Sequence, residues 1–253
     1  MKLRSSIIKC PFIVVAVLFL SITSFAQGLK VAVAANMQGA IKVLAKDFTQ
    51  KTGIQVEPIV GSSGNLSAQI RNGAPFDLFL SADMNFATGL FKDGFSLKEP
   101  EVYAYGNLII CSTQNLSFDH WEKLLTSGQV RKIAIANPAI APYGKAAEES
   151  LKVKGILDNI KPKVVYGESI AQVNTYITTG VVDAGFTTRS LIKDLEGKTI
   201  LYWKEIDHKS YTPIKQGIIM IKQTQNHDNA QKFYDYILSP AAKAILKEYG
   251  YGV

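Results

Sequence analysis

The sequence predicts an α/β protein of two lobes, each a doubly wound, mainly parallel sheet flanked by helices. Short apolar segments alternate with amphipathic segments in two successive series, one before about Tyr105 and one after it, without repeats or low-complexity linkers. A late extended segment at residues 216–221 is followed by helical sequence as far as Tyr249. This order indicates that the C-terminal segment returns to the first lobe.

The first expected lobe comprises residues 27–105 and 213–253, and the second comprises residues 106–212. Two extended segments, near 103–108 and near 211–217, would form a two-segment hinge between them. Ligands of open α/β sheets bind at the carboxyl ends of the strands. We therefore expect the ligand in the crevice between the two lobes.

The first series contains three strand–helix units. Its expected strands are residues 30–35, 55–60 and 76–80, and its expected helices are 36–48, 62–72 and 85–91. The strands are apolar throughout, which is typical of parallel strands covered on both faces. In the first helix, Ala40, Ile41, Leu44 and Phe48 fall on one face, and Gly53 ends it.

The second series follows one long extended segment, Val102 to Ser112. Its expected strands are residues 133–136, 163–166 and 184–186, and its expected helices are 121–125, 143–154 and 170–179. Residues 229–249 predict two further helices, separated at Ser239-Pro240.

The first 26 residues predict a cleaved secretory signal peptide, because basic residues precede an apolar stretch from Phe12 to Leu20 and small residues follow at Ser24 and Ala26. An uncleaved anchor is the alternative, but the apolar stretch is short of the ~20 residues that a spanning helix needs. The remaining 227 residues carry a net charge of +4, since three of 28 basic and none of 21 acidic residues are removed. Their lysines are scattered, which does not favour nucleic-acid binding, and Cys111 alone cannot form an internal disulfide.

Four strand-to-helix junctions offer free backbone N–H groups at the start of a helix, two in each expected lobe. They lie at residues 35–37, 62–64, 137–144 and 167–170. Three add a side-chain donor, Asn36, Ser63 or Tyr143, and none is centred on Lys or Arg. For any one junction alone, helix capping is the simpler interpretation. Together, the four predict a site for a small anion.

A site built only of neutral donors favours an oxyanion without a proton, such as molybdate, tungstate or sulfate. Hydrogen phosphate would require an acceptor, and Glu168 is the one carboxylate within a junction. Another small anion, such as sulfate or a carboxylate, remains an alternative.

Catalysis has little support in the sequence. Residues 61–65 approach the nucleophile elbow of serine hydrolases at Ser63, but Asn65 replaces the last glycine of that motif. The three histidines are far apart and lie at none of the junctions. Gly144-Lys145 lacks the upstream glycine of a P-loop. We therefore predict a binding protein, with a hydrolase using Ser63 as the remote alternative.

The motifs resemble those of the periplasmic molybdate-binding proteins that deliver an oxyanion to an ABC transporter, and the resemblance covers nearly all of the chain after residue 26. It is carried by residues 31–36, 61–70, 72–83, 105–107, 137–138, 141–144 and 239–240. It implies the type II periplasmic-binding fold and closure around the anion by a hinge motion.

The resemblance also implies the ligand-binding residues. The residues that would contact the anion are Asn36 with Ala35 beside it, Ser63, Tyr143 and Ile170. Ile170 would do so through its backbone N–H alone. Some members have Ser in place of Asn36 and a ligand-binding Tyr in place of Thr188. Asn36 and Tyr143 resemble a subgroup whose tyrosine comes from the Ala-Pro-Tyr-Gly loop. That subgroup has Thr at the position of Ala35.

The expected protein is thus a periplasmic, monomeric and non-enzymatic capture component for molybdate and tungstate. Its partners would be a membrane ABC permease and its ATPase, with no nucleic acid. No cofactor, catalytic residue or cation site is expected, because the same residues would hold the oxygens of the anion.

Overall fold

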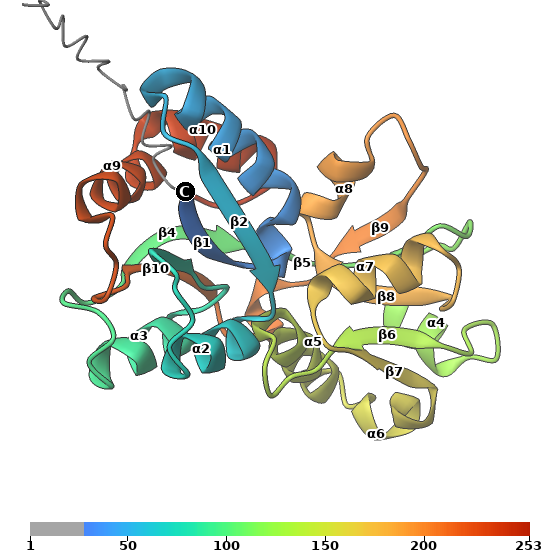
Figure 1. Ribbon diagram of the computed structural model, residues 1–253. Helices are drawn as coiled ribbons and strands as arrows, with labels where there is room; N and C mark the ends of the chain where they lie inside the picture. Colours follow the sequence, from blue (N-terminus) through green and yellow to red (C-terminus); the bar gives the residue numbers. More distant parts are fainter. Residues whose placement is uncertain (1–27) are drawn as a thin grey trace, which may run out of the picture.

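A computed structural model describes residues 28–253 and contains two sheets, each flanked by helices (Figure 1). The expected signal peptide, residues 1–26, lies outside the described residues. Within residues 28–253, no helix is both long enough and apolar enough to cross a membrane.

The first sheet has five strands in the order β2-β1-β3-β10-β4. Their bounds are β1 (Leu29–Ala34), β2 (Val56–Gly61), β3 (Leu78–Leu80), β4 (Glu101–Gly106) and β10 (Ile214–Met220). Strand β1 runs parallel to β2 and β3, whereas β10 runs antiparallel to both β3 and β4. We call this sheet and its helices lobe 1.

Helices cover both faces of the lobe 1 sheet. On one face lie α1 (Gln38–Thr52), α9 (His227–Leu238) and α10 (Pro240–Glu248), and on the other lie α2 (Ser63–Arg71) and α3 (Met84–Lys92). Successive residues of β1 point to opposite faces of the sheet. Val31 and Val33 pack in the core beneath α1, while Ala32 packs with Leu66 of α2. Burial on both faces explains why these strands are apolar throughout.

The second sheet has five strands in the order β7-β6-β8-β5-β9. Their bounds are β5 (Leu108–Ser112), β6 (Ile133–Ala136), β7 (Val164–Gly167), β8 (Ala184–Thr188) and β9 (Tyr202–Glu205). Strand β6 is parallel to β7 and β8, and β5 is antiparallel to β8 and β9. This sheet is lobe 2, together with α4 (Trp121–Thr126), α5 (Pro142–Val153), α6 (Leu157–Ile160), α7 (Ile170–Thr178) and α8 (Ser190–Leu195).

The observed elements follow the expected order with two differences. The long extended segment from Val102 to Ser112 is two strands, β4 and β5, which belong to different sheets. Each sheet contains one antiparallel strand, β10 in lobe 1 and β5 in lobe 2, which agrees with the expected mainly parallel sheets. Helices α6 and α8 and the edge strand β9 were not expected, because such short elements carry too little periodicity to be recognised.

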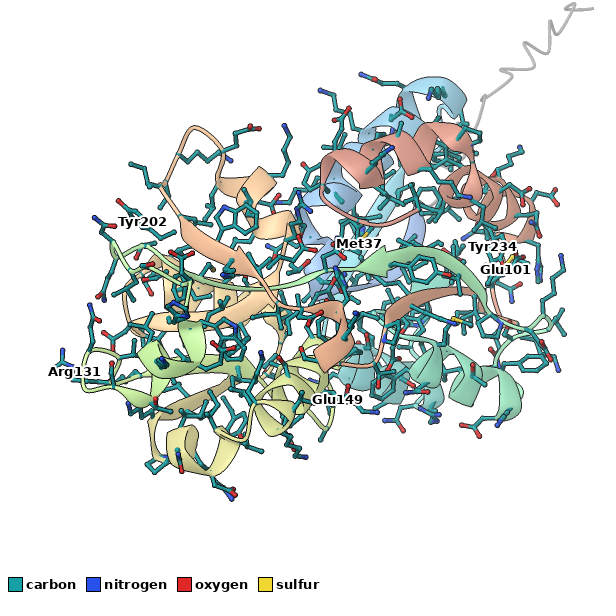
Figure 2. The ribbon with its side chains drawn as sticks, turned by 180° about the vertical axis from the view of Figure 1, so that it is seen from behind. Met37, Glu101, Arg131, Glu149, Tyr202 and Tyr234 are labelled. Atoms are coloured by element: carbon teal, nitrogen blue, oxygen red, sulfur yellow. The ribbon has the colours of Figure 1, made fainter. Side chains whose placement is uncertain are left out.

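The chain passes between the sheets twice, at Asn107 and again between β9 and β10. Near the first crossing, the C-terminus returns to lobe 1, where Tyr105 and Gly252 exchange two backbone hydrogen bonds of 2.7 and 2.9 Å. Behind the molecule, Tyr234 of α9 and Glu101 of β4 lie together (Figure 2), and the Tyr234 hydroxyl donates to the Glu101 carboxylate at 2.9 Å. These contacts tie the last part of the chain to lobe 1.

Candidate functional site

A small cavity lies between the two lobes, at the carboxyl ends of their strands. Its lining is Ala34, Ala35, Asn36, Ser62, Ser63, Ala82, Ala141, Pro142, Tyr143 and Ile170. All five residues expected from the sequence, from both lobes, therefore line one cavity. Within the described chain, no charged residue contributes to this lining.

The cavity is compact: the centre of a water-sized sphere can occupy only about 10 Å³ of it. That volume accommodates roughly one water. A tetrahedral oxyanion is larger, so its entry requires the walls from the two lobes to move apart.

Ser62 and Ser63 have different roles at the start of α2. The Ser62 hydroxyl accepts a hydrogen bond from the Asn65 N–H at 3.4 Å and caps the helix. The Ser63 hydroxyl oxygen accepts from the Ala82 N–H at 2.9 Å, and its side chain is 1% exposed. Because this contact uses a lone pair, the hydroxyl proton of Ser63 can be donated into the cavity.

Tyr143 is held in a similar way in the first turn of α5. Its hydroxyl oxygen accepts from the Thr188 hydroxyl at 3.2 Å, which leaves its own proton for donation. Burial raises the pKa of Tyr143 well above its usual value. The hydroxyl therefore remains a donor across the physiological pH range.

Thr188 and Glu168 do not line the cavity. Thr188 instead positions the Tyr143 hydroxyl. Glu168 is exposed, and its carboxylate accepts from the Asn65 side-chain amide at 2.5 Å, across the boundary between the lobes. The one carboxylate within a junction is thus engaged outside the cavity.

Ile170 is the first residue of α7, and its side chain is 3% exposed. Ser169 caps this helix by accepting from the Gln172 N–H at 3.4 Å. The N–H groups of a first helical turn have no acceptor within the helix. The start of α7 therefore presents the positive end of its dipole where Ile170 lines the cavity.

Ala35 and Asn36 form the short 3-10 turn between β1 and α1. The Asn36 backbone carbonyl oxygen accepts from the Tyr251 hydroxyl at 2.6 Å and from the Ser190 hydroxyl at 2.8 Å. The Asn36 carboxamide donates to the Gln216 side-chain oxygen at 2.8 Å. Sequence reasoning missed Ser190, Gln216 and Tyr251, because each lies more than 150 residues away from Asn36 and belongs to no local motif.

Several hydrogen bonds hold the lobes together around the cavity. The Gly64 N–H of lobe 1 donates to the Ile140 carbonyl of lobe 2 at 2.9 Å. The Ser190–Asn36 and Asn65–Glu168 bonds also join the two lobes. The arrangement is therefore a closed form.

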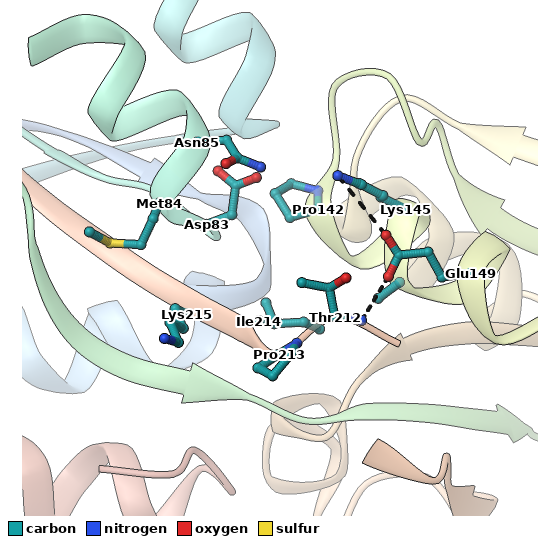
Figure 3. Close-up of a pocket in the computed structure, with 11 residues that line it drawn as sticks. Asp83, Met84, Asn85, Pro142, Lys145, Glu149, Thr212, Pro213, Ile214 and Lys215 are labelled. Carbon is teal, nitrogen blue, oxygen red and sulfur yellow. Dashed lines mark hydrogen bonds and ion pairs between the residues drawn. The ribbon is translucent and has the colours of Figure 1, made fainter. Parts of the chain in front are cut away.

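A larger hollow of about 350 Å³ lies on the hinge side, between α3 and α5 (Figure 3). Its lining includes Lys145 and Glu149, which pair at 4.0 Å, and Glu149 also accepts from the Thr212 N–H at 2.7 Å. None of the five expected residues lines it. This hollow is larger than the cavity, but the cavity is where unpaired donors and helix starts converge.

The part of the chain that the structure describes contains no group of three or more His, Cys, Asp or Glu residues able to hold a metal ion. The cavity is suited instead to an anion, because hydroxyl protons and helix starts surround it without a competing carboxylate. Two lobes that close on such a cavity define a two-lobed anion-binding protein.

Comparisons with known proteins agree with this class. The family model for bacterial extracellular solute-binding proteins matches residues 29–252. Molybdate-binding proteins from Azotobacter vinelandii and Rhodobacter capsulatus are each 34% identical to the chain, over 90% and 87% of it and over 91% and 86% of their own lengths.

Among solved structures, the periplasmic molybdate-binding protein of Azotobacter vinelandii superposes with a TM-score of 0.85 and 35% identity, covering 89% of this chain and 99% of that one. The chain therefore belongs to the bacterial extracellular solute-binding proteins, which are transporter components and not enzymes. The expected two-lobed periplasmic-binding fold and the family resemblance are confirmed.

Proposed function

We propose that this protein captures molybdate, and also tungstate, for uptake by an ABC transporter. The observation that carries the proposal is a closed, uncharged cavity in which the Ser63 and Tyr143 hydroxyls have their oxygens occupied and their protons free. Asn36, Ala35 and Ile170 complete the proposed ligand set. Similarity to molybdate-binding proteins over about nine tenths of the chain supports this ligand class.

The donor set suits an oxyanion that carries no proton. A hydrogen phosphate ion would require an acceptor, and Glu168, the one carboxylate within a junction, is bonded to Asn65 outside the cavity. Sulfate has the same charge and shape as molybdate but is smaller. Cavity size, rather than donor chemistry, would therefore discriminate between these two anions.

Hinge motion would admit the anion. We place the lobe boundaries at 105/106 and 212/213, close to the two crossings of the chain. The proposed ligands come from both lobes, with Ala35, Asn36 and Ser63 on one side and Tyr143 and Ile170 on the other. A bound anion would bridge the two sides and stabilise the closed form.

The proposed partners follow from this role. A membrane ABC permease and its ATPase would receive the anion, and no cofactor or nucleic acid takes part. Residues 1–26 would direct export and be removed, leaving a monomer in the periplasm.

Isothermal titration calorimetry on the purified protein tests the ligand. Molybdate and tungstate are expected to bind tightly and sulfate much more weakly. Sulfate binding as strong as molybdate binding would overturn the proposed selectivity, and tight binding of a small carboxylate alone would replace the ligand class. Turnover of an ester, blocked by a reagent for activated serines, would instead indicate a hydrolase.

Two substitutions test the site. Ser63→Ala and Tyr143→Phe should each weaken molybdate binding by more than ~1 kcal/mol, the cost of losing a hydrogen bond to a charged group. Ser67→Ala is a matched control, because Ser67 lies on the same helix, is buried and bonds Arg71 outside the cavity. Unchanged affinity in both test variants would remove these residues from the site.

A further inference from the structure

The side chains of Asn36 and Gln216 form a buried carboxamide pair beside the cavity. Asn36 is 2% exposed and Gln216 is fully buried. The Asn36 Nδ2 donates to the Gln216 Oε1 at 2.8 Å and to the Tyr251 hydroxyl at 3.3 Å. The Tyr103 hydroxyl donates to the same Gln216 oxygen at 2.9 Å. One amide of the pair lines the proposed anion site, and the other lies behind it.

Two buried side-chain atoms of the described chain have no hydrogen-bond partner, and both belong to this pair: Asn36 Oδ1 and Gln216 Nε2. A buried polar atom without a partner is unfavourable, because it has lost its hydration without gaining a hydrogen bond. Because the Asn36 nitrogen is directed at Gln216, the oxygen is the amide atom left for the cavity. In this arrangement Asn36 offers an acceptor where an oxyanion needs a donor.

A half-turn of both carboxamides places the Asn36 nitrogen, instead of its oxygen, at the cavity. The two side chains stay hydrogen-bonded to each other. Gln216 Nε2 then donates to Asn36 Oδ1 and to the Tyr103 oxygen. The Tyr103 hydroxyl then donates its hydrogen bond to the Ser81 carbonyl, which already lies 3.3 Å away. The Tyr251 hydroxyl continues to donate to the Asn36 backbone oxygen.

The two amides must turn together. If Asn36 turned alone, its oxygen would face the Gln216 oxygen across 2.8 Å without a proton between them. Gln216 is therefore the group that decides whether Asn36 shows an N–H or an oxygen to the cavity.

We propose that Gln216 is a positioning residue for the oxyanion, acting through Asn36. In the anion-bound form, Gln216 donates to Asn36 Oδ1 and so directs the Asn36 Nδ2 protons at an anion oxygen. This inference rests on the proposed function, because it assumes that an oxyanion occupies the cavity.

A double-mutant cycle with molybdate as the ligand tests the inference. Gln216→Met removes both polar atoms at similar length and should weaken molybdate binding about tenfold, the loss of roughly one hydrogen bond to a charged group. In an Asn36→Ala background the same substitution should change affinity by less than about twofold, because its target is gone. Thermal unfolding of all four proteins shows whether each is folded.

A structural role without positioning would give the same loss in both backgrounds, and that result would overturn the inference. No loss in either background would also overturn it. If the native protein does not bind molybdate at all, the proposed function fails and the inference fails with it. Molybdate binding by the native protein together with equal losses would refute the inference alone.

Neutron diffraction from crystals of the native molybdate complex gives a test that does not depend on the stability of any variant. Deuterated nitrogen and oxygen are distinguishable there, and we expect Asn36 Nδ2 to face a molybdate oxygen while Gln216 Nε2 faces Asn36 Oδ1. A complex in which Asn36 Nδ2 still donates to Gln216 would contradict the proposal.

Discussion

The backbone N–H of Gly64 in lobe 1 donates to the carbonyl oxygen of Ile140 in lobe 2 at 2.9 Å. The approach depends on the absence of a side chain at residue 64, since a Cβ there would lie 2.7 Å from the Ile140 Cβ. This pair can form only when the lobes are closed. Gly64, which follows Ser63 in the first turn of α2, is therefore expected to serve closure.

Gly64→Ala should weaken molybdate binding by about 1 to 3 kcal/mol, the usual cost of inserting a methyl group into a well-packed contact. Because the clash is with the other lobe, the free energy of unfolding without ligand should stay unchanged or rise by up to about 1 kcal/mol when the lobes are apart. Calorimetry and chemical denaturation measure the two quantities. The control is Gly128→Ala, because a Cβ at Gly128 meets nothing within 4 Å. Equal affinities of the two variants would show that the Gly64 contact does not limit closure.

Gly106, at the end of β4, makes room for the Tyr143 hydroxyl, which would lie 2.2 Å from a Cβ at this position. Gly106→Ala should displace that hydroxyl from Thr188 and weaken molybdate binding by at least ~1 kcal/mol. The double variant Gly106→Ala, Tyr143→Phe should recover part of any lost thermal stability, because the clashing oxygen is removed. A double variant less stable than Gly106→Ala would contradict this account.

Glu168 is expected to contribute little to ligand affinity. Its bond to Asn65 is exposed, and exposed polar pairs contribute about 0 to 1 kcal/mol. Glu168→Ala should therefore change molybdate affinity by no more than about fivefold and should leave phosphate binding weak. A loss of molybdate affinity much larger than that would place this carboxylate at the ligand after all. Glu168→Gln, which keeps an acceptor for Asn65, is the matched comparison.

Asp183 joins the start of β8 to the segment before β6, since its carboxylate accepts from the Arg131 and Lys132 N–H groups at 2.7 and 2.9 Å. Burial acts to raise its pKa, but these hydrogen bonds outweigh burial, and the pKa of Asp183 is lowered. The stabilisation is therefore present above the unfolded-state pKa of about 3.9 and is lost as the pH falls through the lower folded-state pKa.

Asp183→Asn should consequently lower the free energy of unfolding at pH 7 by about 0.5 to 1.5 kcal/mol, the net value of a hydrogen bond. The difference from the native protein should shrink as the pH falls below about 4. Urea unfolding at several pH values measures both effects. Asp119→Asn is the control, because the Asp119 side chain is 84% exposed. A difference that grows on acidification would reverse the assigned sign.

Local sequence was sufficient to predict most of the fold. Apolar strands buried on both faces and helices with stop signals such as Gly53 were recognisable, because each depends on neighbours within one turn or strand. The segment from Val102 to Ser112 was not resolved into two strands, since nothing local marks Asn107 as the point where the chain changes sheets. The six-residue helix α8 was not predicted.

The candidate site, like the fold, could be predicted from the sequence only in part. By itself, the sequence identified the strand-to-helix junctions and the neutral donors Asn36, Ser63 and Tyr143, because helix starts and their donors are local features. Only the tertiary structure decided that Ser62 caps α2 while Ser63 faces the cavity, that Thr188 holds Tyr143, and that Glu168 lies outside. It alone paired Asn36 with Gln216, 180 residues away. Such contacts depend on how two sheets pack and close, and no local pattern of residues encodes that geometry.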